Sequence, residues 1–416
     1  MGGGHFDFSA GPVLANCVMK VFSLARYRHF QPEPPYWLGG ELIRAGGRLY
    51  LRDAIGAIEI KGETDAETGA LVLFEIVGKP FRARECRAVA KPNGERLPSS
   101  LHAREFPRFV HKVRAFFSAE GLSEIVTPTL VPCPGLEPSL EPFATTVTRG
   151  QKSRTVYLPT SPEIHLKKAL AQGWSDIFEV KSCFRRGEFS EHHDNEFTML
   201  EWYRGFADLD LVIADLRKLL NSLDGPKLEV TDFATLFQDI LKFQLTPETT
   251  RQQLWELAGR LSLDRGDTDS FTDLFHRVMI EKIEPRLVNM GACIVRKFPP
   301  ELAALAKLDA NGWADRFEFY WRGLEIANAF FEVTDPEEQK RRWENEQKER
   351  ARLQTTPLAQ DSEMIEALEK GLPPTAGIAL GVERLYMALN DVKDIRELRL
   401  FPTENLFRSK TISSLY

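Results

Sequence analysis

The stretch FRRGEFSEHHDNEFTMLEWY, residues 184 to 203, decides the fold of most of this chain. FEVKSCFR, which leads into it, and EFTMLEWY, which ends it, alternate apolar and polar side chains, so the pattern predicts two strands joined by the polar loop GEFSEHHD. A merely solvated loop is one explanation of the charges. Charged groups are rare on buried strands unless they are paired or bind a ligand. Arg185 at the strand end, and Glu196, Glu201 and Tyr203 on the returning strand, therefore indicate a site.

A second segment, DRFEFYWRGLEIANAFFEV at 315 to 333, repeats this mixture of carboxylates and aromatic residues. Glu318, Glu325 and Glu332 recur at a spacing of seven, which fits a helix face, but strands joined by the Arg-Gly turn at 322 and 323 could bring them to one sheet face. Carboxylates that share a surface repel each other unless cations hold them. Mg²⁺ bound by one or two carboxylates and by substrate phosphates is one solution; an internal ion-pair network is the other.

Two further segments indicate phosphate and helix-capping chemistry. GIALGVERLYMAL at 377 to 389 reads as a strand entering a helix, with Arg384 in the first helical turn. A cation opposes the helix dipole there unless an anion is bound, so phosphate is the natural ligand. TSPEIHLKKAL at 160 to 170 begins a helix with Ser161 and Glu163, which capping alone could explain equally well.

Together these segments resemble the signature motifs of class II aminoacyl-tRNA synthetases of the lysyl branch. EGLSEIVTPTL at 120 to 130 resembles motif 1, residues 184 to 203 resemble motif 2, and GIALGVERL resembles motif 3. The resemblance covers about residues 101 to 402. It implies an α+β fold with an antiparallel sheet flanked by helices, a homodimer formed through motif 1, and an aminoacyl-adenylate made from ATP with Mg²⁺.

Within this branch the chain is most similar to the lysyl-tRNA synthetase-like ligases that modify elongation factor P with β-lysine. Ser161 in TSPE and Ala379 in IALG favour that subfamily, whereas LPPTAG at 372 to 377 is more similar to a true lysyl-tRNA synthetase. The resemblance implies activation of lysine or β-lysine and its transfer to a lysine of elongation factor P. Ligation of lysine to tRNA, or a catalytically impaired paralogue used for binding, are the alternatives.

The resemblance also implies roles for individual residues. Arg185 and Arg384 are the expected catalytic residues, and Glu318 and Glu325 the expected Mg²⁺ ligands. The expected ATP-binding residues are Arg185, Arg186, Glu188, His193, Asp194, Phe197, Glu325, Ile326, Gly381 and Arg384. The expected amino-acid-binding residues are Ser161, Glu163, Tyr203, Asn328, Phe330, Glu332 and Ala379.

The sequence departs from the family at a few of these motif positions. Gly187 stands where motif 2 usually has an acidic residue, and Glu188 is expected to substitute from the next position. Asp194 replaces an asparagine that contacts ATP, and its charge would repel a triphosphate unless it is neutralised. Ala329 and Phe331 replace the usual neighbours in the pocket, which we expect to narrow it.

The N-terminal part predicts a separate small β-rich domain. WLGGELI, RLYLRD, GAIEIK and ALVLFEIVG are short β-rich runs separated by turns, and their order resembles the oligonucleotide-binding (OB) barrel that precedes the catalytic unit of lysyl-tRNA synthetases. The expected domains are 1–95 (OB-like), 101–404 (catalytic) and a tail at 405–416. Residues 1 to 96 hold about thirteen Lys and Arg against about eleven Asp and Glu. That is less basic than is usual for RNA binding.

The remaining chain reads as ordinary globular sequence. Phe106, Phe109, Val110, Val113, Phe116 and Phe117 form a helical stripe ending near Gly121, and the mixed charges at 336 to 350 predict a solvated helix face. Hydrophobic content of 43% allows a sizeable core, and a net charge of -6 argues against a generally basic nucleic-acid-binding surface. Five scattered cysteines favour a reducing cytoplasm, and without a long apolar run we expect no membrane association.

Overall fold

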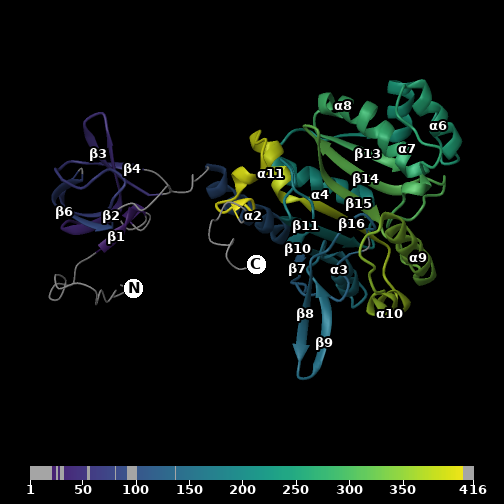
Figure 1. Ribbon diagram of the computed structural model, residues 1–416, viewed down its shortest axis with the longest axis horizontal. Coiled ribbons are helices and arrows are strands. Elements are labelled where there is room, and N and C mark those ends of the chain that lie inside the picture. Colours follow the sequence, from purple (N-terminus) through teal and green to yellow (C-terminus); the bar gives the residue numbers. More distant parts are fainter. Residues whose placement is uncertain are drawn as a thin grey trace. The chain divides into compact units, whose positions relative to one another are not determined.

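The computed structural model describes residues 21–24, 27–28, 32–53, 57–79, 81–90, 101–135 and 137–405. The chain divides into two compact units, Met1–Ser99 and Ser100–Tyr416. Figure 1 labels their elements. The predicted linker at 91–100 and, beyond residue 405, the predicted tail lie outside the described residues. The assignment of separate roles to the predicted domains stays a prediction.

The first unit is a curled β-sheet. Its strands are β1 (Val21–Ser23), β2 (Tyr36–Ala45), β3 (Arg48–Arg52), β4 (Ala57–Ile60), β5 (Leu71–Gly78) and β6 (Arg82–Ala90). Antiparallel neighbours follow the order β4-β3-β2-β5-β6, and β1 lies parallel to β2. Lys61, just after β4, pairs in parallel with Arg82 at the start of β6, so the two ends of the sheet meet. The result is a partly closed five-stranded barrel, as the OB-like prediction requires.

Side chains from β2, β3, β4 and β5 supply a buried centre, among them Leu38, Leu51 and Phe74, and Ala83 and Cys86 of β6 pack against it. Four of the five barrel strands follow from the sequence pattern. The fifth, β6, has the sequence RARECRAVA, in which charged residues obscure the alternation that marks a strand.

The second unit is built on an eight-stranded, mainly antiparallel sheet. In spatial order its strands are β12 (Glu229–Asp232), β13 (Cys293–Phe298), β14 (Ala314–Trp321), β15 (Leu324–Phe331), β16 (Thr375–Gly381), β11 (Glu196–Gly205), β10 (Asp176–Phe184) and β7 (Ser123–Glu124). The pairs at the two edges are parallel and the inner pairs are antiparallel. This confirms the predicted α+β class. It also shows that residues 315 to 333 form a strand hairpin, not a helix.

Three helices cover one face of this sheet: α2 (Leu101–Ala119), α4 (Leu209–Ser222) and α11 (Val382–Asn390). The predicted stripe of α2 is buried against the sheet, and Gly121 follows the helix with φ of +84°, a conformation that suits glycine. The oxygen of Asp208 caps α4 by accepting hydrogen bonds from the first-turn amides. Because these helices bury the apolar side chains of one face, the opposite face is left for polar groups.

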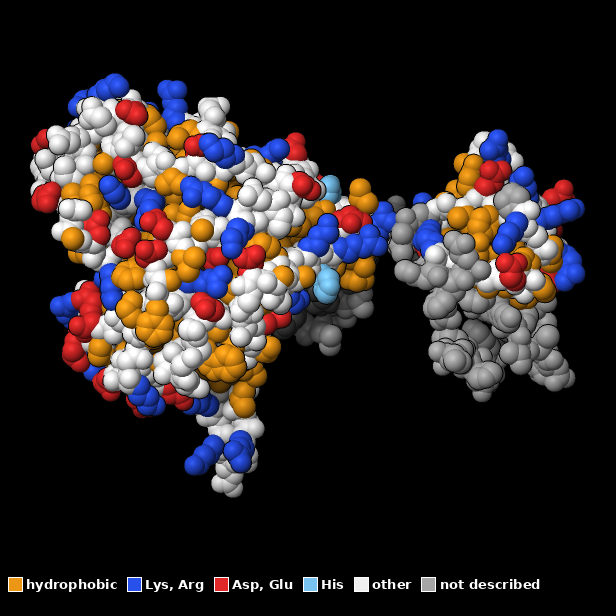
Figure 2. All heavy atoms as spheres, turned by 180° about the vertical axis from the view of Figure 1, so that it is seen from behind, with side chains coloured by type: hydrophobic (Ala, Val, Ile, Leu, Met, Phe, Trp, Pro, Cys, Tyr) orange, Lys and Arg blue, Asp and Glu red, His pale blue; other side chains and the backbone are white. Residues whose placement is uncertain are grey.

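The other elements surround this sheet. β8 (Ala144–Arg149) and β9 (Lys152–Tyr157) form a hairpin that projects from the unit, and Figure 2 shows basic side chains at its tip. The remaining α-helices are α3 (Glu163–Leu170), α5 (Phe233–Leu236), α6 (Arg251–Arg260), α7 (Phe271–Val278), α8 (Glu284–Leu287), α9 (Pro336–Leu353) and α10 (Ser362–Lys370). Single turns of π-helix (Phe237–Leu241, Met279–Ile283) and of 3₁₀-helix (Val288–Met290, Pro300–Leu302, Ile395–Leu398) complete the list. Of the helices described, none has the length and apolarity needed to cross a bilayer.

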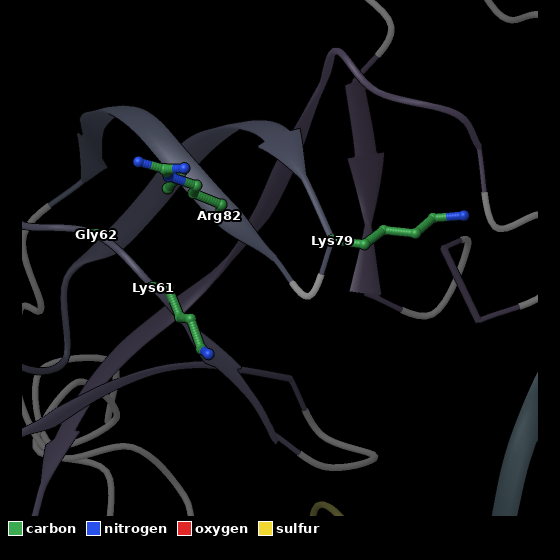
Figure 3. Close-up of a pocket in the computed structure, with 5 residues that line it drawn as sticks. Lys61, Gly62, Lys79 and Arg82 are labelled. Atoms are coloured by element: carbon green, nitrogen blue, oxygen red, sulfur yellow. The ribbon is translucent and has the colours of Figure 1, made fainter.

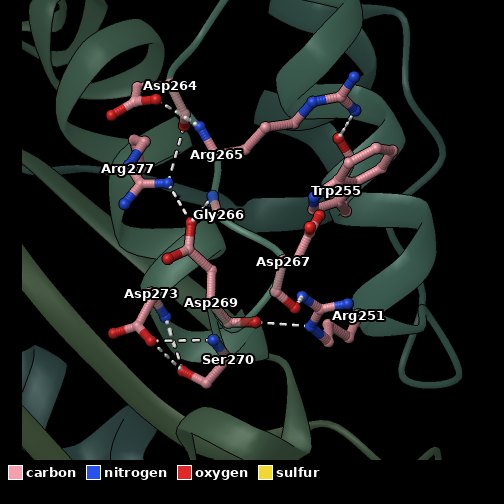
Figure 4. Close-up of polar contacts among 10 residues, drawn as sticks. All are labelled: Arg251, Trp255, Asp264, Arg265, Gly266, Asp267, Asp269, Ser270, Asp273 and Arg277. Atoms are coloured by element: carbon pink, nitrogen blue, oxygen red, sulfur yellow. Dashed lines mark hydrogen bonds and ion pairs between the residues drawn. The ribbon is translucent and has the colours of Figure 1, made fainter.

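The helices α5 to α8 pack into a second apolar core beside β13. Three arginines contact the loop between α6 and α7 and stabilise its conformation (Figure 4). Arg251 donates to the carbonyl oxygens of Asp267 and Asp269, each at 2.5 Å, and Arg277 donates to the Asp264 carbonyl at 2.7 Å. Arg265 lies 3.5 Å from the centre of the Trp255 ring. Every one of these contacts is internal to the loop and its two helices, so the cluster is structural.

The helix α9 has the predicted solvated face, on which Glu337, Arg341, Glu344 and Lys348 are exposed. Its other face, which the charge pattern did not reveal, is buried at Gln339, Trp343 and Arg350. Trp343 belongs to the apolar cluster that contains Tyr203, and Arg350 donates to the carbonyl oxygens of Glu137 at 2.7 Å and of Thr356 at 3.2 Å. A charged side chain can be buried in this way when backbone carbonyls satisfy its donors.

Candidate active site

The face of the sheet opposite α2, α4 and α11 carries most of the predicted site. Alternation along β11 sends Leu200 and Trp202 into the helix-covered core, and this sends Glu201 and Tyr203 to the other face. In β14, Phe317 and Phe319 face the core, which places Arg316 and Glu318 on the site face. A strand pattern therefore brings residues distant in sequence to one surface.

Strand register sets these residues in two adjacent rows across β11, β16, β15 and β14. The first row pairs Glu201, Ala379, Asn328 and Glu318 in succession. The second row pairs Tyr203, Gly377, Phe330 and Arg316. The residues Tyr203, Asn328, Phe330 and Ala379, predicted to bind an amino acid, are thus direct neighbours. The small residues of β16, Gly377 and Ala379, lie between larger side chains of β11 and β15, so those side chains can approach the β16 backbone.

Ser161 and Tyr203 converge on the buried carboxylate of Glu201. Ser161 Oγ donates to Glu201 Oε1 at 2.6 Å and accepts from the Glu163 amide at 3.0 Å, while the Tyr203 hydroxyl donates to Glu201 Oε2 at 3.1 Å. Burial, with a further contribution from the nearby Glu163, raises the pKa of Glu201 to about 8. The sequence marked Glu201 as an anomaly on a buried strand but did not assign it to the pocket.

Glu163 and Glu332, both predicted to bind the amino acid, are joined by Lys167 of α3. Lys167 Nζ lies 2.6 Å from Glu332 Oε2 and also donates to Glu163 Oε1. Burial lowers the pKa of Lys167, but the two carboxylates more than offset this and leave it above its ordinary value. Burial raises the pKa of Glu332 to about 7, although Lys167 acts in the opposite direction. The sequence signal for Lys167 is its position four residues after Glu163 on one helix.

Arg316 organises the Glu318 end of the rows. Its guanidinium donates to Glu318 Oε1 at 2.6 Å, to Asn328 Oδ1 at 3.0 Å and to the Leu302 carbonyl at 2.7 Å. The Tyr320 hydroxyl donates to the other oxygen of Glu318. Glu318 and Glu332, two of the three carboxylates that recur every seven residues, therefore lie in different clusters. Glu318 belongs to the cluster around Arg316, and Glu332 belongs to the cluster around Lys167.

Glu325 lies close enough to Glu318 for the two charges to interact. Burial, and then repulsion by Glu318, raises the pKa of Glu325 to about 7, while Arg384, Arg316 and Arg185 act to lower it. Two repelling carboxylates of this kind suit a divalent cation. Among the residues described, no group of three or more His, Cys, Asp or Glu is arranged to hold a metal. Mg²⁺ commonly takes one or two carboxylates and completes its shell with water and substrate phosphates, so Glu318 and Glu325 could hold it.

The two predicted catalytic arginines lie on either side of the motif 2 loop. The Arg185 guanidinium stands 5.0 Å from the centre of the Phe197 ring and 3.9 Å from Glu188 Oε1. Arg384 donates to the Glu325 carbonyl at 2.8 Å and contacts His193 Nε2. Burial and the positive charge of Arg384 lower the pKa of His193, so the neutral ring can accept that bond. One guanidinium group beside an aromatic ring, with a second in contact with the motif 2 loop, is suited to a nucleotide with phosphates.

The departures in motif 2 have local explanations. Gly187 adopts φ of +87°, which a side chain would strain, and its amide donates to Asn195 Oδ1 at 2.9 Å. Glu188 supplies a carboxylate beside Arg185 from the next position, as expected. Asp194 is buried and accepts from Thr403 Oγ1 at 3.0 Å and from the Asn195 amide at 2.7 Å. Its charge therefore holds the C-terminal segment against the loop.

The expected narrowing of the pocket by Ala329 and Phe331 was wrong. Ala329 is fully buried in the core under the helices, and Phe331 packs against the same core. Alternation along β15 turns both away from Asn328 and Phe330. Of the other predicted ATP-binding residues, Ile326 is buried, Gly381 precedes Arg384 at the start of α11, and the Arg186 side chain is exposed.

Comparison with known proteins agrees with this arrangement. Residues 91–405 match the family described as tRNA synthetases class II (D, K and N). The chain is 35% identical over 306 residues to the elongation factor P–(R)-β-lysine ligase of Haemophilus influenzae, covering 72% of this chain and 94% of that protein. The ligases of the same name from Hamiltonella defensa and Pasteurella multocida are each 34% identical, covering 93% and 94% of those proteins and 71% and 72% of this chain.

Proposed function

Since the chain belongs to the class II tRNA synthetase family of the D, K and N group, we propose that it activates lysine or β-lysine with ATP and transfers the aminoacyl group to a lysine of elongation factor P. The chain is an ATP-dependent amino-acid ligase of the class II type. The name and coverage of its relatives support the choice of acceptor.

The continuity between an acidic pocket and a cationic one is the observation that carries this proposal. Glu201, Asn328 and Glu318 occupy one row of the sheet, and Glu325, which neighbours Glu318, feels the charges of Arg185 and Arg384. An amino acid with two ammonium groups fits the acidic end, and ATP fits the arginine end. The carboxylate of the amino acid would then lie next to the phosphates of ATP.

The reaction follows from this placement in two steps. The carboxylate of the amino acid attacks the α-phosphorus of ATP, the bond to the bridging oxygen breaks, and pyrophosphate leaves. Arg185 would hold the charge that develops on the α-phosphate, and Arg384 would hold the departing phosphates. The neutral amine of the acceptor lysine then attacks the carbonyl carbon of the adenylate, and AMP leaves. When bound at Glu318 and Glu325, Mg²⁺ would reduce the repulsion between phosphates.

Two features support the remaining assignments. Val126 and Leu130 of the motif 1 segment are 88% and 49% exposed, as expected for a surface that pairs with a second copy. The chain would then act as a homodimer. The described cysteines, Cys86, Cys133, Cys183 and Cys293, are unpaired, which favours a reducing compartment such as the cytoplasm.

Pyrophosphate exchange tests the proposal. The protein is incubated with ATP and labelled pyrophosphate, and with lysine or (R)-β-lysine in turn; we expect label to enter ATP with at least one of them. Labelled amino acid is then offered with elongation factor P and, separately, with tRNA. No exchange with either amino acid would refute both ligase functions, and charging of tRNA alone would refute the choice of acceptor.

Ligation to tRNA is the second candidate, because the first unit has the strand order of an OB barrel. Lys61, Lys79 and Arg82 line a surface cavity of about 550 Å³ where β4 meets β6. However, Figure 3 shows their side chains pointing in different directions, and Lys79 pairs with Glu33 at 3.3 Å. The cavity is thus not a convergent phosphate site, so elongation factor P remains our first choice.

A further inference from the structure

The lysine that joins the two pocket carboxylates is more deeply buried than is usual for lysine. The side chain of Lys167 is 3% exposed, and its partners Glu332 and Glu163 are 1% and 15% exposed. Lysine is rarely buried without a partner, and here one ammonium group is shared by two carboxylates from different elements, α3 and the segment after β15. Its neighbour Lys168 instead pairs with Asp361 at 2.8 Å and with Glu363 at 2.9 Å.

The ammonium group of Lys167 contacts one oxygen of the Glu163 carboxylate and one oxygen of the Glu332 carboxylate. It engages Glu163 Oε1 and Glu332 Oε2. The other oxygen of Glu332 faces Gly377, since a Cβ atom built on that glycine would lie 2.7 Å from Oε1. Gly377 lies between Tyr203 and Phe330 in the second row of the site. Lys167 thus holds both carboxylates while Glu332 presents its remaining oxygen at the site face.

The formal charges of this cluster match a diamino acid. With a diamino acid bound, its two ammonium groups favour the ionised form of each carboxyl group, so Glu163, Glu201 and Glu332 contribute −3 and Lys167 contributes +1, which gives −2. The two ammonium groups of lysine or β-lysine contribute +2. Glu137 and Glu346 also interact with Glu163, and burial raises the pKa of both, whereas Lys307 acts on Glu332. Without Lys167, three carboxylates would face two ammonium groups, and one would be left buried and unpaired.

We propose that Lys167 is a specificity-determining positioning residue, which holds Glu163 and Glu332 and sets the pocket charge to that of a substrate with two ammonium groups. This inference rests on the proposed function, because it takes Glu163, Glu201 and Glu332 as the amino-acid pocket. The step it affects is binding of the amino acid, not transfer of the adenylyl group. Its loss should therefore raise KM for the amino acid and leave KM for ATP near the wild-type value.

Lysine-dependent pyrophosphate exchange tests this with K167M, E332Q, the double variant K167M/E332Q and the control K168M. K167M should raise KM for lysine about tenfold or more, because Glu163 and Glu332 lose the ammonium group that holds both of them in place. The double variant has Glu163 and Glu201 alone and returns to −2. Its rise in KM should consequently be smaller than the product of the two single rises. K168M should match wild type.

The result that overturns the inference is a K167M protein whose KM for lysine equals that of K168M, or single effects that multiply in the double variant. If K167M does not fold, K167Q keeps a donor for one carboxylate but no charge, and it should show the same direction of change. A wild-type protein that exchanges with neither lysine nor (R)-β-lysine would refute the proposed function itself. These two failures are distinguishable because the second is seen before any variant is made.

Discussion

Gly377 is the position where one added carbon should disturb the site most. A Cβ atom there would lie 2.3 Å from Tyr203 Cε1, 2.5 Å from Tyr203 Cδ1 and 2.7 Å from Glu332 Oε1. Tyr203 is held through its hydroxyl by Glu201 and Glu332 is held by Lys167, so neither can withdraw without losing a buried polar contact. The substitution G377A should therefore shift the two side chains that line the predicted pocket.

The expected cost follows from these contacts. Overpacking a filled interior costs about 1 to 3 kcal/mol, and weakening the hydrogen bond between Tyr203 and Glu201 adds roughly 1 kcal/mol. G377A should accordingly lower the free energy of unfolding by about 2 to 4 kcal/mol, measured by urea denaturation. KM for lysine in pyrophosphate exchange should rise as well, since both displaced side chains line the pocket.

Gly381, in the same strand, provides a matched control for stability. A Cβ atom there would lie 3.8 Å from the nearest atoms of Arg384, at ordinary contact distance, and its φ of -76° suits any residue. G381A should therefore unfold within about 0.5 kcal/mol of wild type. If G377A were as stable as G381A and kept the wild-type KM for lysine, Tyr203 and Glu332 could not lie against Gly377.

Four other substitutions, one of them a control, test the electrostatics and the loop. Because burial and then Glu163 raise the pKa of Glu201 to about 8, the folded protein keeps a proton from about pH 5 to about pH 8 that the unfolded chain loses. Stability should fall as pH rises through that range, and E201Q should flatten the fall in unfolding midpoints measured against pH. R316M should lower the free energy of unfolding by about 3 kcal/mol, because it leaves the Glu318 carboxylate poorly paired. The control R322M removes an exposed pair with Asp391 and should change the free energy of unfolding by less than about 1 kcal/mol. Equal effects of the two substitutions would contradict the role of Arg316. T403V should raise KM for ATP in exchange assays but not KM for lysine, because the hydroxyl holds Asp194 of the motif 2 loop; an unchanged KM for ATP would count against that role.

The strands of the site could be predicted because alternation is a local property of the sequence. EFTMLEWY and GIALG each place alternate residues on opposite faces, so the hairpin at 184 to 203 and the strand before Arg384 follow without knowledge of partners. The same rule, applied to residues 324 to 331, would have shown that Ala329 and Phe331 face the core. The expectation that Ala329 and Phe331 narrow the pocket was wrong because it considered only their positions next to Asn328 and Phe330 in the sequence, and not the face of the strand on which each side chain lies.

The roles of Lys167, Arg316 and Thr403 could not be predicted from local pattern. Each depends on a contact with a residue remote in sequence: Lys167 with Glu332, Arg316 with Leu302 and Asn328, and Thr403 with Asp194. Lysine, arginine and threonine side chains are mostly exposed in folded proteins, so the sequence alone gives no reason to bury these three. Register between strands, which a single sequence does not reveal, decides which charges meet.

The position of β16 has a consequence for synthesis of the chain. This strand lies between β11 and β15, pairing Met199 with Gly381 and Asn328 with Ala379. Until residues 375 to 381 leave the ribosome, β11 and β15 each present an open edge, and the sheet consists of two separate halves. Late insertion of a central strand is a slow, long-range step. A nascent chain should therefore depend on rapid completion, or on chaperones, to avoid pairing its edges with other chains.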